Sequence, residues 1–199
     1  MTTTEPVDKL SIALDATEHL VAGVRDDQWT DPTPCTEWNV RDLVGHLVVG
    51  NHAFASILRG QRPAAPREIL GPGRDLPSAY RDSAAAVVGA FRQPGVLERL
   101  FTVPFGTVPG IVALHLRVTE ALVHGWDLAR ATGQAADFPD DLAEEELAFS
   151  RAKLGDVPPG RSPFAPPQPV ADDAPAIDRL AACLGRSVAA DVPASRMAS

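Results

Sequence analysis

The sequence predicts an all-α protein whose core is an up-and-down or related four-helix bundle. Four long segments carry hydrophobic residues at helical spacing, stretches rich in Gly and Pro separate them, and a convincing set of long alternating strands is missing. The chain has 199 residues, of which 45% are hydrophobic. That is enough for one well-packed core and too little for two ordinary domains, so we expect residues 1–199 to form a single domain.

The first two helices follow from periodicity and capping. The segment 9–27 places apolar side chains such as Leu10 and Leu14 near helical spacing and contains no Pro. After the turn-forming stretch DPTPCTEW, Asn39 stands three residues before Asp42 as an N-cap with an acidic partner, ahead of VRDLVGHLVVGNHAFASIL. We therefore expect a second helix from about 40 to 59.

Breaker residues mark the third helix and the segment after it. Pro77 or Ser78 can open a helix over AYRDSAAAVVGAFR, and Gln93-Pro94-Gly95 ends it because proline cannot continue the hydrogen-bond ladder. The next segment, LERLFTVPFGTVPG, is rich in β-branched and aromatic residues interrupted by glycine. Around 96–109 we expect a small hairpin or an extended loop.

The longest expected helix covers about 110–132, where an apolar stripe runs to Gly133, which stands at the position of a C-cap glycine. Another helix is expected over 140–154, because its acidic start and basic end complement the helix dipole. We expect the acidic residues within 140–146 to face solvent.

The C-terminal part is expected to be less regular. A Pro-rich connector at about 155–175 should lie extended over the surface. A short extra helix should cover AIDRLAACLGR, and the tail at about 187–199 should be frayed.

Charge and cysteine content exclude several classes of function. The formal net charge is -8, and Lys and Arg do not cluster among aromatics, so we expect no nucleic-acid partner. The sequence lacks both a leader and an apolar run long enough for a membrane span, which predicts a cytoplasmic protein without a membrane partner. We expect a monomer or a homodimer. Cys35 and Cys183 lie outside any CxxC spacing and are expected to be reduced and structural.

One face of the helix expected over 110–132 carries the candidate metal-binding residues. In EALVHGWDLA, Glu120, His124 and Asp127 are separated by steps of four and three, which places them within roughly 60° of one another around the helix. A Glu and a His one turn apart suit a divalent metal such as Zn²⁺, with a third ligand from elsewhere. We expect Asp127 to accept a hydrogen bond from a ligand, or to form a structural hydrogen bond, rather than to be an obligatory ligand itself.

The histidines differ in their suitability as that third ligand. His115 lies about 180° from His124 around their helix, His52 lies about 120° from His46, and His19 is a surface candidate. His46 stands in an apolar stripe and is the best third ligand. The alternative is a hydrogen-bonded core histidine beside a solvated Glu/His pair.

Trp38 and Trp126 are the aromatic residues nearest to these motifs. Aromatic residues beside turns and apolar stripes mostly fill cores. We therefore expect both tryptophans to pack in the core rather than to line a substrate pocket.

Two segments, DPTPCTEWNVRDLVGHLVVGN and TEALVHGWDLARATGQ, resemble the hallmark segments of the mycothiol-dependent maleylpyruvate isomerase N-terminal domain family. The resemblance extends to FAPPQPVADDAPAIDRLAACLGR and is closest to short, single-domain actinobacterial members. It implies a DinB-like four-helix bundle in which His46, Glu120 and His124 bind a metal. Zinc is the first expectation, and the same donors also suit nickel, cobalt or iron.

The resemblance also implies a function. Members of the family use the low-molecular-weight thiol mycothiol, and a metal beside a thiol favours the nucleophilic thiolate. We thus expect a metal- and thiol-dependent transferase or isomerase that acts on a small electrophilic substrate. The alternatives are a non-catalytic metal-binding or ligand-sensing module, and a bundle that keeps the residue pattern without binding a metal.

Overall fold

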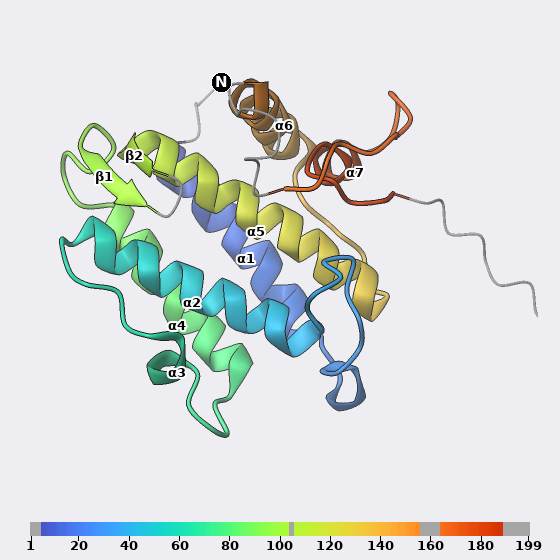
Figure 1. Cartoon of the computed structure of the whole chain (residues 1–199), viewed down its shortest axis with the longest axis horizontal. Coiled ribbons are helices and arrows are strands. Elements are labelled where there is room, and N and C mark those ends of the chain that lie inside the picture. Colours follow the sequence, from blue (N-terminus) through green and yellow to red (C-terminus); the bar gives the residue numbers. More distant parts are fainter. Residues whose placement is uncertain (1–4, 104–105, 156–163, 189–199) are drawn as a thin grey trace, which may run out of the picture.

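The computed structural model describes residues 5–103, 106–155 and 164–188 (Figure 1). These residues are mostly helical, with one small sheet. The elements in chain order are α1 (Pro6–Ala22), the 3-10 helix η1 (Asp26–Gln28), α2 (Val40–Leu58), α3 (Pro66–Ile69), α4 (Leu76–Phe91), β1 (Leu100–Val103), β2 (Gly106–Pro109), α5 (Gly110–Thr132), α6 (Asp140–Gly155) and α7 (Ala176–Cys183).

Helices α1, α2, α4 and α5 form the expected four-helix bundle. α1 packs mainly against α4 and α5, and α2 also packs against α4 and α5. Consecutive helices α1 and α2 therefore occupy opposite corners, so the bundle is a relative of the simple up-and-down form, in which consecutive helices are neighbours. The core between them is apolar and includes Leu10, Leu47, Val87 and Leu122, all fully buried.

Two further helices and a hairpin complete the described structure. α6 and α7 pack on each other and on α5, outside the bundle (Figure 1). β1 and β2 pair antiparallel, with Leu100 opposite Pro109, just before α5 begins. The hairpin predicted as one of two possibilities around 96–109 is thus the observed structure, and the extra C-terminal helix is α7.

Capping explains where the main helices begin and end. The Asn39 side chain accepts a hydrogen bond from the Asp42 N–H at 2.9 Å and starts α2 as predicted. Gly133 ends α5 with φ of 69°, in the left-handed region that glycine adopts without strain. α4 starts earlier than predicted, because Asp75 rather than a later residue accepts the capping hydrogen bond from the Ser78 N–H.

Other boundaries also differ from the prediction. α1 begins at Pro6 and ends at Ala22, while the following residues form the separate turn η1. The short helix α3 lies in the Gly- and Pro-rich stretch between the second and third predicted helices, where no helix was predicted. In the Pro-rich connector, residues 164–175 are irregular, and residues 156–163 lie outside the described residues. Of the tail predicted at about 187–199, residues 189–199 also lie outside them.

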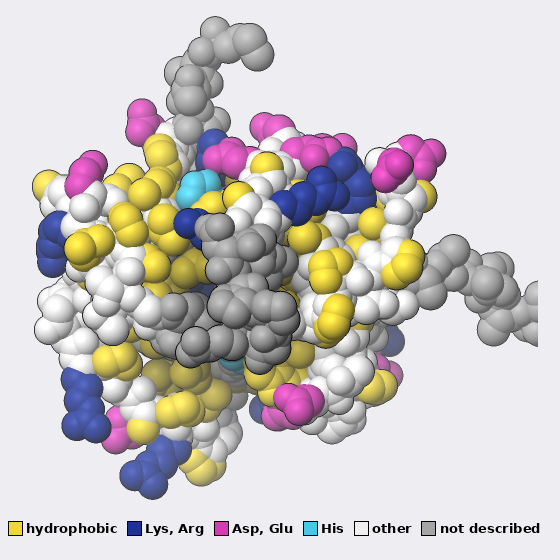
Figure 2. Space-filling model, turned by 45° about the horizontal axis from the view of Figure 1, so that its top comes forward, with side chains coloured by type: hydrophobic (Ala, Val, Ile, Leu, Met, Phe, Trp, Pro, Cys, Tyr) yellow, Lys and Arg dark blue, Asp and Glu magenta, His cyan; other side chains and the backbone are white. Residues whose placement is uncertain are grey.

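The surface carries charges of both signs. On the face shown in Figure 2, acidic and basic side chains lie among hydrophobic ones. None of the helices in the described residues combines the length and the apolarity that a membrane crossing needs.

Candidate metal centre

His46, Glu120 and His124 meet at the contact between α2 and α5. Nε2 of His46 lies 3.0 Å from Oε2 of Glu120, and Nε2 of His124 lies 3.5 Å from the same oxygen. One donor atom from each of the three side chains lies within 4.8 Å of the other two. The structure therefore brings together the three residues predicted as ligands, with two imidazole nitrogens converging on one carboxylate.

Burial around this cluster is asymmetric. The side chain of His124 is 7% exposed and that of Glu120 is 16% exposed, whereas that of His46 is 36% exposed. His46 follows the buried Leu43 on α2 by three residues and lies at the edge of the apolar stripe. The cluster is thus closed toward the core and accessible on the side of His46.

Glu120 is held as a carboxylate. Burial alone would favour its protonated form, but hydrogen bonds with His124 and His46 and the nearby Arg117 charge hold the pKa of Glu120 well below its usual value. Arg117 lies three residues before Glu120 on α5, with Nη1 3.8 Å from Oε2 of Glu120. An ionised carboxylate between two imidazoles is the form that binds a cation.

The buried Arg117 is held in place from α2. Its Nη2 donates to Oδ1 of Asn51 at 2.9 Å, and its guanidinium lies 5.1 Å from the centre of the Phe54 ring. A Cβ at Gly50 would lie 2.9 Å from Nη1 of Arg117, so glycine leaves the space that the guanidinium occupies. Arg117 was not among the residues predicted from the sequence, although its spacing of three from Glu120 was a usable signal.

A second hydrogen-bonded layer supports His124. Nδ1 of His124 lies 3.0 Å from Oδ2 of Asp127, so the two side chains form a hydrogen bond. Asp127 in turn pairs with Arg186, which lies after α7. Burial opposes the protonated form, but hydrogen bonds to Asp127 and Glu120 raise the pKa of His124.

Trp38 borders the cluster, contrary to the expectation that it fills the core. Its ring centre lies 4.4 Å from that of His46 and 5.7 Å from that of His124. Trp126 does pack in the core, where its Nε1 donates to Oδ1 of Asp178 at 2.6 Å. Trp38 is placed differently because the 29–39 loop folds back onto the start of α2, where the Trp38 carbonyl accepts from Thr33.

A cavity of about 730 Å³ opens beside His46 and Trp38. Its wall combines apolar side chains with two arginines. The lining residues are Trp38, Arg41, Asp42, Gly45, His46, Val49, Pro66, Leu70, Gly71, Pro72, Gly73, Arg74 and Leu76.

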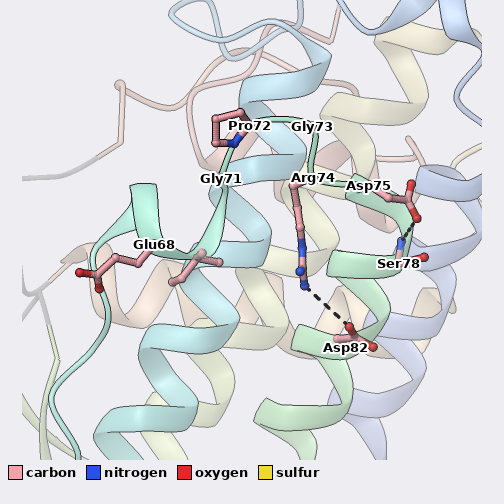
Figure 3. A pocket seen from close by; sticks show the side chains of 9 residues that line it. Glu68, Gly71, Pro72, Gly73, Arg74, Asp75, Ser78 and Asp82 are labelled. Atoms are coloured by element: carbon pink, nitrogen blue, oxygen red, sulfur yellow. Dashed lines mark hydrogen bonds and ion pairs between the residues drawn. The ribbon is translucent and has the colours of Figure 1, made fainter.

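A second cavity, of about 600 Å³, shares the stretch from Gly71 to Arg74 with the first (Figure 3). In Figure 3, Arg74 extends toward Asp82, 3.8 Å away, and Asp75 faces Ser78. The three predicted ligands are not among the residues that line this second cavity, which is mostly polar.

His115 lies apart from the cluster, as predicted. Its Nδ1 pairs with Oε1 of Glu146 at 2.7 Å, and its ring stacks on Phe149. Glu146 is 1% exposed and also accepts from Thr119 at 2.8 Å, so the expectation that all the acidic residues of 140–146 face solvent is wrong for Glu146. The reason is that α6 packs against α5 through the side of α6 that carries Glu146.

Cys35 lies closer to the cluster than its isolated position in the sequence indicated. One donor atom each of Cys35, His124 and Asp127 lies within 4.8 Å of the other two. Burial raises the pKa of the Cys35 thiol, which favours the neutral form. Cys183 is also free.

The chain is similar to several known proteins. The family model described as "Mycothiol maleylpyruvate isomerase N-terminal domain" matches residues 10–129, a range that contains the three predicted ligands. The uncharacterized protein Rv0738 of Mycobacterium tuberculosis is 43% identical over 178 residues, which cover 88% of this chain and 94% of that protein. Another uncharacterized protein of that organism, Rv0036c, is 27% identical over 60% of this chain and 53% of its own length.

A solved structure shares the fold. The crystal structure of the mycothiol-dependent maleylpyruvate isomerase superposes with a TM-score of 0.58 at 20% identity, over 74% of this chain and 71% of that chain. At this level of identity the similarity establishes the arrangement of the helices.

Proposed function

The chain belongs to the mycothiol maleylpyruvate isomerase N-terminal domain family, and on that premise we propose that it is a metal- and thiol-dependent transferase or isomerase. His46, Glu120 and His124 hold one divalent transition metal, with zinc as the first candidate. The thiol is a low-molecular-weight thiol of the mycothiol type, and the substrate is a small electrophile.

The observation that carries the proposal is the convergence of two Nε2 atoms on one ionised carboxylate beside a cavity. Two histidines and one glutamate are a donor set found in catalytic zinc sites, which keep a coordination position for water or substrate. A purely structural site would instead be enclosed by protein ligands. Here His46 lies in the wall of the cavity, so a small molecule can reach that side of the cluster.

Each residue of the cluster and its surroundings has a separate role in this proposal. Glu120 supplies negative charge, and Asp127 accepts from Nδ1 of His124, which leaves Nε2 of His124 on the side of Glu120 to bind a metal. Trp38 lies against one side of the His46 ring and so forms part of the boundary of the cluster. A bound metal would favour the thiolate form of the thiol and polarise the electrophile.

The cavity suits two small reactants. Its volume of about 730 Å³ falls within the usual range for small-molecule sites. Arg41 and Arg74 in its wall outnumber the one acidic residue, Asp42, and so favour ligands with a negatively charged group, while Leu70 offers apolar contact. This combination supports a thiol and an electrophile of which at least one carries an anionic group.

Elemental analysis of untagged protein, together with His46→Ala and His124→Ala variants, tests the metal site. We expect about one equivalent of transition metal in the parent and little in either variant. His52→Ala is the matched control, because His52 lies on the same helix outside the cluster, and it should keep the metal. Absence of metal in the parent after reconstitution with zinc would contradict the proposal.

Catalysis needs a separate measurement. Metal-loaded protein is mixed with mycothiol and a panel of small electrophiles, and both loss of free thiol and conversion of the electrophile are followed with and without a chelator. Thiol consumption or substrate isomerisation that disappears on chelation, and in His46→Ala, supports the enzyme. Stoichiometric metal without any thiol-dependent reaction would instead favour the non-catalytic module.

A further inference from the structure

We propose that Arg186 is a positioning residue of the metal centre, which acts through Asp127 to hold His124 with Nε2 directed at the metal. The inference rests on the proposed function, because it takes His124 as a ligand. It makes the segment after α7 a working part of a site whose ligands lie on α2 and α5. Arg186 lies beyond residues 10–129, so the family match gives it no role.

The contacts form a continuous chain. Arg186 donates from Nε to Oδ1 of Asp127 at 3.3 Å and from Nη2 to Oδ2 at 2.9 Å, the two-pronged geometry of an arginine–carboxylate pair. Oδ2 of Asp127 also lies 3.0 Å from Nδ1 of His124. The Asp127 side chain has no exposure, and that of Arg186 is 10% exposed, so the pair lies largely away from solvent.

The end of α7 is built to aim Arg186 at Asp127. The Arg186 N–H donates to the Ala181 carbonyl and the Gly185 N–H donates to the Ala182 carbonyl, both at 3.0 Å, which is the Schellman pattern. Gly185 has φ of 87°, and a Cβ there would lie 2.6 Å from Cβ of Ala165. The guanidinium is fixed further, because its Nη1 donates to the Leu184 carbonyl.

α7 itself is anchored on α5 close to Asp127. Asp178 of α7 accepts from Trp126, the residue before Asp127, and Leu180 of α7 is fully buried. The position of the guanidinium therefore depends on packed helices and not on a loosely held side chain. This rigidity is what a group that orients a ligand through another residue requires.

Removal of Arg186 leaves a buried carboxylate without its counter-charge. Asp127 can then lower its energy by turning away or by drawing the His124 ring into another orientation, and either change misdirects Nε2. Loss of a partner behind a metal ligand typically lowers metal affinity by about 10- to 100-fold. We expect a loss in this range for Arg186→Met.

The test measures zinc affinity by competition with a chromophoric chelator, and the absorption spectrum of the Co²⁺-loaded protein. Arg186→Met should bind zinc about 10- to 100-fold more weakly and show an altered Co²⁺ spectrum. Arg186→Lys, which keeps the charge without the two-pronged geometry, should recover part of the affinity. Arg179→Met is the matched control, because Arg179 binds Glu144 and not Asp127, and it should match the parent.

A double-mutant cycle with Asp127→Asn shows whether Arg186 acts through Asp127. If it does, Arg186→Met costs little further affinity once Asp127 is replaced. Full additivity, or equal zinc affinity of Arg186→Met and the parent, would overturn the inference while leaving the proposed function intact. A parent that binds no zinc would overturn both.

Discussion

At the residue scale, the chemistry depends on how the charge of Glu120 is compensated. Two histidines and Arg117 surround a carboxylate that is 16% exposed. Within the described residues, Nε of the buried Arg117 has no hydrogen-bond partner, a cost that the rest of its guanidinium offsets through Asn51 and Glu120. Arg117 therefore adds to the hydrogen bonds from His124 and His46 that hold the pKa of Glu120 well below its usual value.

Replacement of this arginine should destabilise the fold. Arg117→Met leaves Glu120 and Asn51 buried without their cationic partner, and breaking such a buried pair costs about 3 kcal/mol. Urea denaturation of the metal-free protein measures the loss. Arg92→Met is the control, because Arg92 pairs with Asp8 on the exposed surface, and its effect should be small. Equal effects of the two variants would contradict this account of Arg117.

At the element scale, α6 is attached to α5 by a polar network as well as by apolar packing. Glu146 of α6 joins His115 and Thr119 of α5, and Lys9 of α1 binds the neighbouring Glu145. Glu146 lies on the side of α6 that also buries Leu142. An acidic helix start can therefore contribute an inward carboxylate where a neighbouring helix offers donors.

This network predicts a pH dependence of stability. The hydrogen bond to Glu146 raises the pKa of His115 above its ordinary value, although burial opposes the shift, so the folded state binds the proton more tightly than the unfolded state. The contribution of His115 to the free energy of unfolding is complete below about pH 6.5, the ordinary pKa of histidine. It is lost as the pH rises through the higher pKa of His115 in the folded state.

The free energy of unfolding of the parent and His115→Gln, measured at several pH values between about 5.5 and 8.5, checks this prediction. The advantage of the parent should shrink as the pH rises. His19→Gln, at an exposed histidine, should show no such trend relative to the parent. A parent advantage that stays constant or grows with pH would contradict the prediction.

At the scale of the whole molecule, the candidate site joins two helices of the bundle. His46 belongs to α2, Glu120 and His124 belong to α5, and the supporting Arg186 follows α7. α2 and α5 are neighbours in the bundle, while the hairpin and α6 lie elsewhere on α5. A metal at this point would link two separately packed helices, so its binding energy should add to the stability of the fold.

Zinc should consequently raise the melting temperature. At a free concentration of about 100 times Kd, binding adds about 2.7 kcal/mol, which corresponds to roughly 5 to 10 °C for a chain of this size. Differential scanning calorimetry with zinc, and again after addition of a chelator, measures the shift and its reversal. His46→Ala should show no comparable shift, and a shift of the same size in that variant would place zinc elsewhere.

Much of the local structure could be read from the sequence because its causes are local. The Asn39 cap and the Gly133 terminus act within one turn of chain, and both helix ends are observed as predicted. The predicted starts of α1 and α4 were less accurate, because several residues near Pro6 and near Asp75 could each begin a helix. The family resemblance is confirmed, while the role of the three residues in metal binding stays a prediction.

The sequence by itself determined the helices, their apolar faces and the shared face of Glu120, His124 and Asp127, since helical periodicity fixes which residues align. Only the tertiary structure decided which helices are neighbours. It brought His46 against Glu120 across 74 positions of sequence and Arg186 against Asp127 across 59 positions. It also placed Trp38 beside the cluster and buried Glu146. These contacts depend on how several helix faces pack together, and no short-range pattern in the chain encodes that packing.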